Sequence, residues 1–446
     1  MADATPASTL PANAQPPRWP RLVAALLFFA IAFSRSLGTP DDYPRDFFIH
    51  RLGSQLVIRG ENPYDIPKIR QHIADAFPLD DGETLFQNTV PLVTGDFAAW
   101  LLPADQLIRT SFPMNCGYFM PPMTLVVYAP FAVLPWVPAM ILWAIVNGVA
   151  AYVVTRLPSL VLTPGESTPW LLAVLAPFLM LMNPTAPVIV FPDGQTSMVS
   201  LGFVVAGLLA YERGRFSLMA VLWVFPFVKP HLALPLIPLL WFLGGWRPAL
   251  LLIGLVGLLN AIGATIVGGS PLFLKEYIDF LPQAREVVLG NRVEMNNRLS
   301  SWNRLLYAHG GPLIELGFVT TVAGYLVWYS LLIGRWALDG ERPSAAWAVA
   351  ATGAGAVLCS QVIGYEFVIV LMALPWVRDL FLSGDRIRGS LGFLFLFCVC
   401  INYLDWVGAS GPHVREHNSL AIALFALMVL TGPTRLRPPT PAVASA

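Results

Sequence analysis

Long apolar segments run through most of the chain and constrain its fold more than any other feature. A helix needs about 20 apolar residues to cross the hydrocarbon core of a bilayer. Only 12% of the 446 residues are charged and 56% are hydrophobic, whereas a soluble domain carries roughly 25% charged residues. We therefore predict an all-α polytopic membrane protein with about 11–13 transmembrane helices. The candidate spans are 21–37, 118–135, 137–156, 169–191, 194–211, 215–229, 231–245, 248–268, 313–334, 344–360, 366–382, 388–405 and 417–433.

The two ends of the chain differ from this apolar body. Residues 1–20 are rich in alanine and proline, and we expect a disordered cytoplasmic N-terminus there. The apolar segment 21–37 is followed by no A-x-A-like cleavage site, so it is interpreted as an uncleaved signal-anchor. A single transmembrane domain is expected over 21–433, with a cytoplasmic tail over 434–446.

Two polar stretches, 39–117 and 269–312, interrupt the apolar pattern. The first is net acidic, as the positive-inside bias predicts for a translocated loop. If each predicted span crosses the membrane, the arginines of the short loops all lie on the same side, which we assign to the cytoplasm. Both long stretches, and the turns near Gln195, Lys229 and Tyr365, are then extracytoplasmic. Region 118–191 has three apolar segments where an even number of crossings is required, so one of them is expected not to cross. The arginines in question are Arg213, Arg215, Arg247, Arg335, Arg342, Arg386, Arg388, Arg435 and Arg437.

Charge and motif content exclude several classes of function. Lys plus Arg equals Asp plus Glu at 27 each, which argues against nucleic-acid binding. The cysteines Cys359, Cys398 and Cys400 lie within apolar runs and are interpreted as small buried side chains, not as metal ligands. The sequence contains no Walker A loop, HExxH or G-x-S-x-G motif. We predict neither a metal site nor a cofactor.

A first polar cluster follows the first predicted span. Apolar positions over 44–59 predict an amphipathic helix, which we expect to lie at the membrane interface. Asp46, His50 and Ser54 recur every four residues and share one face of that helix. A carboxylate at the edge of a low-dielectric cavity is a suitable general base, because partial desolvation raises its pKa toward neutrality. The alternative, which the position of Asp46 alone favours, is that it caps the helix N-terminus.

A second cluster is Lys229-Pro230-His231, which lies between two apolar runs. Pro230 breaks the helix and leaves Lys229 at the outer end of a hairpin. A lysine there can bind a phosphate group as a point charge. The alternative is a lysine that snorkels from a helix end toward the membrane surface.

A third cluster is Gly364-Tyr365-Glu366 at the start of an apolar run. Glu366 could be a second carboxylate for acid–base chemistry, or simply an acid stabilised by the helix dipole. Polar and aromatic residues of the predicted outer loops are further candidates for binding sugars and phosphates. These are Tyr118, Gln195, Arg298, Trp302 and Arg304.

Taken in order, these segments resemble glycosyltransferase family 87, whose members are polyprenol-phosphate-sugar-dependent membrane enzymes with the GT-C fold. The resemblance covers roughly positions 20–400 and is carried by Asp46-Phe47, Gly60-x-Asn62-Pro63-Tyr64-Asp65, Tyr118-x-x-Pro121-Pro122, Gly194-Gln195, Glu212-Arg213-Gly214-Arg215, Lys229-Pro230-His231, Gly245-Trp246-Arg247 and Tyr365-Glu366.

The resemblance implies transfer of a hexose, typically mannose, from a polyprenyl-phosphate donor to a lipid or glycan acceptor on the extracytoplasmic face of the cell (inner) membrane, with inversion. It assigns the catalytic carboxylate to Asp46, with Glu366 as a second carboxylate. Donor phosphate binding is expected from Lys229, His231, Arg298 and Arg304. Substrate binding is expected from His50, Gln195, Tyr118, Trp302 and Tyr365.

Two non-enzymatic interpretations are also compatible with a polytopic chain. A transporter or lipid flippase usually places polar residues at mid-membrane in broken helices, whereas the polar clusters here lie at predicted outer turns. A membrane assembly subunit without activity would not depend on Asp46, Lys229 or Glu366.

Overall fold

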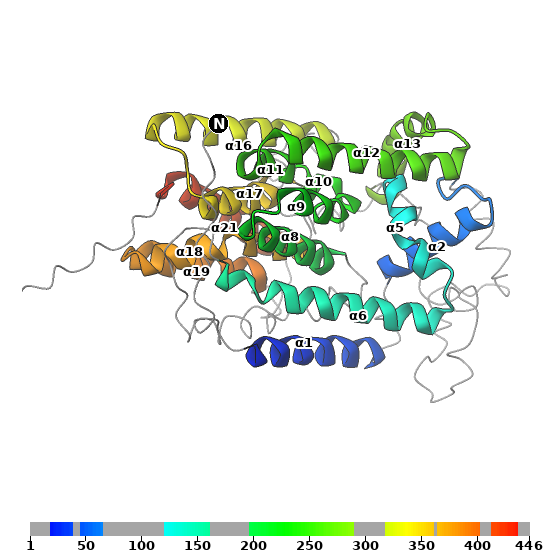
Figure 1. The fold of residues 1–446 in the computed structure, drawn as a ribbon, viewed down its shortest axis with the longest axis horizontal. Coiled ribbons are helices and arrows are strands. Elements are labelled where there is room, and N and C mark those ends of the chain that lie inside the picture. Colours follow the sequence, from blue (N-terminus) through cyan, green and yellow to red (C-terminus); the bar gives the residue numbers. More distant parts are fainter. Residues whose placement is uncertain are drawn as a thin grey trace, which may run out of the picture.

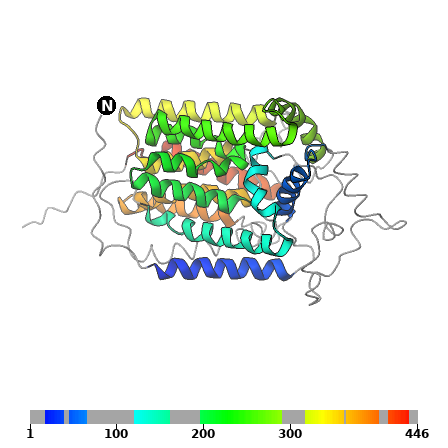
Figure 2. The same ribbon diagram turned by 45° about the vertical axis from the view of Figure 1, so that its right-hand side comes forward.

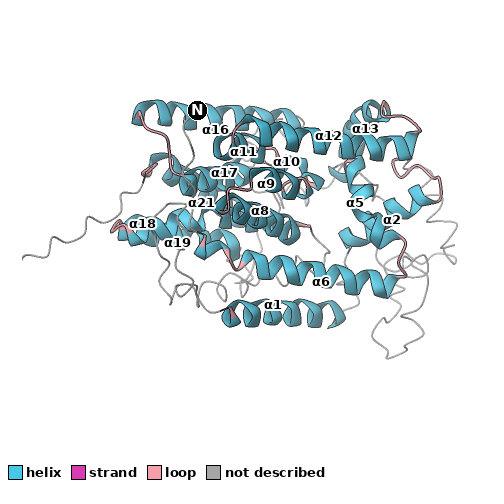
Figure 3. Ribbon diagram, viewed as in Figure 1, coloured by secondary structure: helices cyan, strands magenta, loops and turns pink. Residues whose placement is uncertain are grey.

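A computed structural model describes residues 18–38, 45–65, 120–160, 196–289, 317–360, 364–401 and 412–435. Within these ranges every regular element is an α- or 3₁₀-helix, which confirms the predicted all-α class (Figures 1 and 3). The elements are α1 (Trp19–Gly38), α2 (Arg45–Ile58), α5 (Pro122–Ala132), α6 (Trp136–Val154), η4 (Leu157–Ser159), α8 (Ser197–Glu212), α9 (Phe216–Leu222), η6 (Phe225–Val228), α10 (Pro230–Ala233), α11 (Leu236–Gly244), α12 (Trp246–Gly268), α13 (Phe273–Leu289), α16 (Gly317–Asp339), α17 (Ala345–Cys359), η8 (Gly364–Ala373), α18 (Leu374–Leu382), α19 (Arg386–Ile401) and α21 (Pro412–Thr431).

The long helices form a bundle in which α6 packs against α8, α16 against α17, and α17 against α21 (Figures 1 and 2). Helix α1 lies along α6 at one edge of this bundle, whereas α2, α5 and α13 gather at one end. Close packing depends on glycine: a Cβ on Gly202 would lie 2.8 Å from the Cβ of Ala150, which brings α8 onto α6.

Two described helices are long and apolar enough to cross a membrane, within Pro138–Ser159 and Trp246–Gly268. Helix α12 also exposes Leu250, Ile253 and Ile266, as expected of a lipid-facing surface. The other apolar helices found among the described residues are shorter. The predicted number of crossings therefore remains a prediction.

Prolines divide the segments predicted to span at 215–229 and 231–245. Pro226 is the second residue of η6, Pro230 begins α10, and Pro235 precedes α11. The broken segment stays on the bundle because Trp223 Nε1 donates to the carbonyl of Val204, at 3.1 Å. The expected helix breaks are confirmed, and they leave Lys229 between two short helices.

Helix α2 confirms the helix predicted over 44–59, but it buries polar residues as well as apolar ones. Phe47 and Leu56 of the expected apolar face are buried, as predicted, whereas Ile58 is exposed. The polar residues Arg51 and Ser54 are also buried. Arg51 donates to the carbonyls of Phe131 (3.0 Å) and Leu134. The last carbonyls of a helix have no intrahelical donor, so this cation caps the C-terminal end of α5.

The segments assigned to the two outer stretches meet at the end formed by α2, α5 and α13. Tyr64, just after α2, packs edge-on against Tyr277 and Phe280 of α13, and its hydroxyl donates to the carbonyl of Met120, at 2.8 Å. Region 269–312 was expected to be a polar loop, but its first part forms the helix α13. One side of that helix packs its aromatic residues inward, and the polar composition of the segment as a whole gave no sign of this packing.

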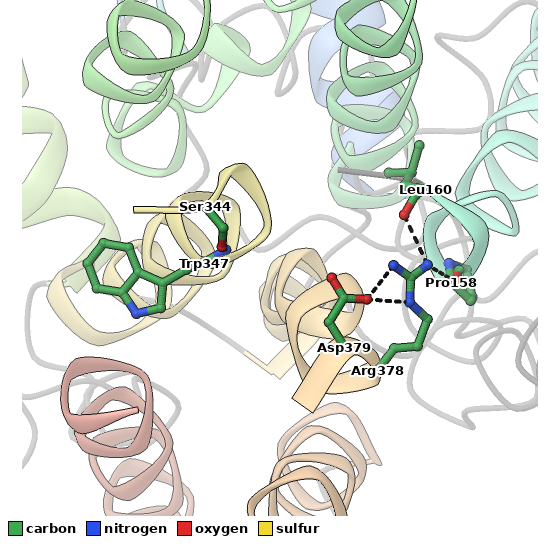
Figure 4. A network of polar contacts seen from close by, with 6 residues as sticks. All are labelled: Pro158, Leu160, Ser344, Trp347, Arg378 and Asp379. Carbon is green, nitrogen blue, oxygen red and sulfur yellow. Dashed lines mark hydrogen bonds and ion pairs between the residues drawn. The ribbon is translucent and has the colours of Figure 1, made fainter. Parts of the chain in front are cut away.

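The opposite end of the bundle, which we call the arginine end, is held by paired charges. Arg378 in α18 is buried, pairs with Asp379 and donates to the carbonyls of Pro158 and Leu160, at 2.8 and 3.0 Å (Figure 4). Near it in the same view, Ser344 caps α17 by accepting from the backbone N–H of Trp347, at 3.2 Å. Further pairs join the ends of neighbouring helices: Arg435 with Glu341, Thr434 with Asp339, and Arg342 with the carbonyl of Phe242.

Candidate functional site

The structure describes the side chains of three predicted site residues: His50, Lys229 and His231. Asp46 lies in α2, and Tyr365 and Glu366 lie in η8, but the side chains of these three are outside what the structure describes. The remaining candidates lie outside the described residues altogether. They are Tyr118, Gln195, Arg298, Trp302 and Arg304.

Lys229 occupies the junction between η6 and α10 and is only 5% exposed. A snorkelling lysine would hold its ammonium group in water, so the observed burial favours the alternative in which the cation serves an enclosed site. Its side chain lines a cavity of about 20 Å³ together with Ser200 of α8 and Thr352 of α17. A cavity of this volume has room for about one water molecule.

His50 lies on α2 and is fully enclosed. Its ring stacks obliquely on Tyr128, with 4.7 Å between ring centroids. Burial, together with the positive charge of Lys229, lowers the pKa of His50 to about 3. The imidazole is therefore neutral at physiological pH, and its Nδ1 atom has no hydrogen-bond partner in the described part of the structure. This electrostatic effect places His50 and Lys229, two predicted site residues from distant segments, in the same region of the bundle.

The turn that carries Lys229 is fixed by a hydrogen-bond network at His231, two residues further along the chain. The carbonyl of His231 accepts from the hydroxyls of Tyr325 (2.8 Å) and Ser360 (2.7 Å), and these hydroxyls lie 2.6 Å apart. Tyr325 belongs to α16 and Ser360 follows α17, so two long helices hold the turn in place. In the described structure His231 thus contributes a backbone carbonyl, whereas the sequence suggested its side chain.

Several polar residues of this region were missed by sequence reasoning. Tyr325 and Ser360 lie within apolar runs and carry no local motif. The hydroxyls of Thr196, Ser197 and Ser200 follow directly after Gln195, a predicted site residue, and their spacing places them on one side of a helix. That spacing was a usable signal, since hydroxyls on one side of a helix start can donate to a common ligand.

These parts have the composition of an anion-binding site: a buried cation, a neutral imidazole and a row of hydroxyls. A family model described as Glycosyltransferase family 87 matches residues 118–361, more than half of the chain.

The chain belongs to glycosyltransferase family 87. The predicted family is thereby confirmed, and the protein is a glycosyltransferase whose substrates are a sugar donor and an acceptor. The matched region includes α8 and Lys229, whereas Asp46 and Glu366 lie outside it. No curated protein shows significant sequence similarity to the chain.

The family 87 enzyme shows no cluster of three or more His, Cys, Asp or Glu side chains arranged to hold a metal ion within its described residues. Among the described residues, Lys229 and the hydroxyl groups of Thr196, Ser197 and Ser200 are groups able to interact with an anion. The arrangement can bind a phosphate and hold it away from bulk water, where a cation attracts it more strongly.

Proposed function

We propose that this glycosyltransferase is a multi-pass membrane enzyme that transfers a hexose, preferably mannose, from a polyprenyl-phosphate donor to a lipid or glycan acceptor. Transfer takes place on the extracytoplasmic face of the cell membrane and inverts the anomeric centre. The observation that carries the proposal is the family match over 118–361, because that region contains the enclosed cation Lys229.

The reaction we propose is a single displacement. The acceptor hydroxyl oxygen attacks the anomeric carbon and forms the new glycosidic bond, while the bond from that carbon to the phosphate oxygen breaks. Asp46 accepts the proton of the acceptor hydroxyl, and polyprenyl phosphate leaves as the anion. One carboxylate is sufficient for this step, because inversion needs no covalent glycosyl-enzyme intermediate. Glu366 is the second carboxylate that we place at the site.

The position of α2 supports the role of Asp46. Asp46 lies four residues before His50, about one helical turn, and His50 is near enough to Lys229 for the lysine charge to lower the pKa of the imidazole. Helix α2 is also held firmly, since Arg51 and Ser54 bond to carbonyls of α5. A general base needs a fixed position within about 2.6–3.2 Å of the proton that it removes.

A lipid-linked donor is supported by an apolar groove of about 340 Å³ on the surface of the bundle. Residues of α16, α17 and α21 line it, among them Val327, Leu358 and Leu427. Cys359 also lines the groove, and the next residue, Ser360, bonds to the carbonyl of His231 in the turn that carries Lys229. We assign this groove to part of the polyprenyl chain, which would place the phosphate toward Lys229.

The orientation in the membrane is proposed from charge. The arginine end carries Arg342, Arg435 and the other loop arginines, and cytoplasmic loops are enriched in such residues. The end with α2, α5 and α13 is then extracytoplasmic, and Lys229 belongs to that side.

The test is donor selectivity in purified protein reconstituted in lipid nanodiscs. We expect polyprenyl-phosphate-mannose to yield free polyprenyl phosphate and a mannosylated product when a cell-envelope lipid extract is supplied as acceptor. Mannose should not be transferred from a nucleotide-mannose. Transfer from the nucleotide donor alone would overturn the proposal, whereas transfer of another hexose from its polyprenyl phosphate would correct only the sugar.

A further inference from the structure

The N-terminal end of α8 is buried, but its first backbone N–H groups have no hydrogen-bond acceptor among the described residues. The first intrahelical bond runs from the N–H of Ser200 to the carbonyl of Thr196, at 2.8 Å. The N–H groups of Ser197, Met198 and Val199 precede it, and no acceptor for them is present among the described residues. A buried helix end without such partners requires another explanation, since the first N–H groups of a helix need an acceptor.

Three side-chain hydroxyls at this helix end are also buried without a hydrogen-bond partner among the described residues. Thr196 is 1%, Ser197 0% and Ser200 5% exposed, and none of their hydroxyl oxygens has a hydrogen-bond partner in the described structure. Thr196 occupies the N-cap position of α8 without making a cap bond, whereas Ser344 caps α17 in the usual way. Enclosed polar groups are normally paired, so three unpaired hydroxyls side by side indicate an absent ligand.

These hydroxyls face the same way as Lys229. Ser200 lines the small cavity with Lys229, and Thr196 and Ser197 lie about one turn earlier on the same side of α8. The cavity holds about one water molecule, so a larger anion lies one turn further out, at the helix terminus itself. There the helix dipole, the hydroxyls and the N–H groups that have no acceptor among the described residues all favour negative charge.

We propose that the N-terminus of α8 binds a phosphate monoester group, with Thr196 and Ser197 as hydroxyl donors and Ser200 beside Lys229 in the small cavity behind them. The identification of this group as the phosphate of a polyprenyl-phosphate substrate rests on the proposed function. These three residues are binding residues that hold the phosphate in place while the bond to the sugar breaks.

The experiment measures binding without turnover to the intact protein in nanodiscs, with three probes. Farnesyl phosphate carries chain and phosphate, farnesol carries the chain alone, and inorganic phosphate carries the anion alone. The variants are Thr196→Val, Ser197→Ala, Ser200→Ala and the triple combination, all of which remove a hydroxyl with little change of shape. Thr196→Ser retains the hydroxyl, and Ser419→Ala in α21 is a matched control, since Ser419 is equally buried and unpartnered.

We expect each hydroxyl loss at α8 to raise the dissociation constant for farnesyl phosphate about tenfold, because hydrogen bonds to a charged group are the stronger class. Thr196→Ser and Ser419→Ala should bind as the wild type does, and farnesol binding should not change in any variant. Without ligand, the triple variant should melt no lower than the wild type, since it loses only unpaired groups.

Unchanged farnesyl phosphate binding in the triple variant would overturn the proposal, as would an equal loss of farnesol binding. Inorganic phosphate that binds as tightly as farnesyl phosphate, with the same dependence on the hydroxyls, would support the phosphate site and assign it to free phosphate. If the protein binds farnesyl phosphate through α8 but transfers no sugar, the phosphate site is supported and the proposed function is wrong. If the triple variant binds farnesyl phosphate as the wild type does and still transfers sugar, the proposed phosphate site is wrong but the proposed function stands.

Discussion

The most enclosed polar side chains at the two ends of the helix bundle differ in their hydrogen bonding. At the arginine end, Arg378 is 1% exposed, yet it pairs with Asp379 and with two backbone carbonyls. At the other end, which we call the α8 end and define by His50, Thr196, Ser197, Ser200 and Lys229, the hydroxyls and the Nδ1 atom of His50 have no partner among the described residues.

This contrast separates structure from function. Enclosed polar groups that are fully bonded among themselves hold helices together, and substrate adds nothing to them. Enclosed polar groups without partners cost stability, and they are retained where a substrate completes the bonding. The comparison therefore predicts that substitutions at the arginine end change stability, whereas substitutions at the α8 end change activity.

The largest effect is expected from Asp46→Asn on α2. Loss of the proposed general base should lower the rate of sugar transfer by about 10²–10⁴-fold, while the melting temperature stays within a few degrees of the wild type. The measurement is product formation in nanodiscs together with a thermal scan. Asp385→Asn at the arginine end is the control, because Asp385 pairs with the half-exposed Arg388 and should have no effect on rate. Full activity of Asp46→Asn would remove Asp46 from the mechanism.

The next largest effect is expected at the buried ion pair of the arginine end. Arg378→Met leaves Asp379 as an unpaired buried charge and should destabilise the protein by about 3–5 kcal/mol, measured by denaturation in detergent. The turnover of the protein that remains folded should be unchanged. Arg388→Met breaks an exposed pair, which is worth at most about 1 kcal/mol.

The double variant Arg378→Met with Asp379→Leu tests the cause of that loss. If the unpaired carboxylate is responsible, removal of both charges should recover much of the stability. If turnover per folded molecule falls in either variant, the assignment of stability to the arginine end and of activity to the α8 end would be wrong.

Much of the fold was predictable because it depends on local sequence. Apolar runs gave the all-helical class, and Pro226 and Pro230 gave the breaks around Lys229. The packing of α2 was not predictable, since Arg51 bonds to a carbonyl 80 residues away and backbone acceptors leave no mark on the side-chain pattern.

The candidate site was predicted only in part for the same reason. Lys229 stood out because a lysine between apolar runs is conspicuous. Tyr325 and Ser360 were hidden, because each is an ordinary residue of an apolar helix until the carbonyl of His231 lies beside it. The pairing of residues so far apart depends on helix packing, which one sequence does not specify.

Lys229→Ala should weaken donor binding by about ten- to a hundredfold, the range expected for a charged hydrogen bond, and leave acceptor affinity unchanged. The measurement is a pair of titrations, one with each substrate. Lys275→Ala is a matched control, because Lys275 is an exposed lysine of α13 paired with Asp279. Equal weakening of donor and acceptor would indicate that Lys229 supports the fold of the α8 end instead of binding phosphate.

The smallest effect concerns acid stability at the α8 end. The pKa of His50 is about 3 in the folded protein because of burial and the charge of Lys229, and it is about 6.5 in an unfolded chain. Between these values the unfolded chain binds a proton that the folded protein excludes, so falling pH favours unfolding. Stability should therefore be complete above pH 6.5 and decline by about 1.4 kcal/mol per pH unit below it.

His50→Asn should remove this contribution, so its stability should fall less than that of the wild type between pH 6.5 and 5.5. The measurement is a series of melting curves for both proteins across that range. Because His50 stays neutral in the folded state, its titration should also leave no mark on the rate of sugar transfer near pH 6.5. A rate profile with a step there that disappears in His50→Asn would mean that the imidazole gains a proton in the folded enzyme, and that Lys229 does not repel that proton as the geometry requires.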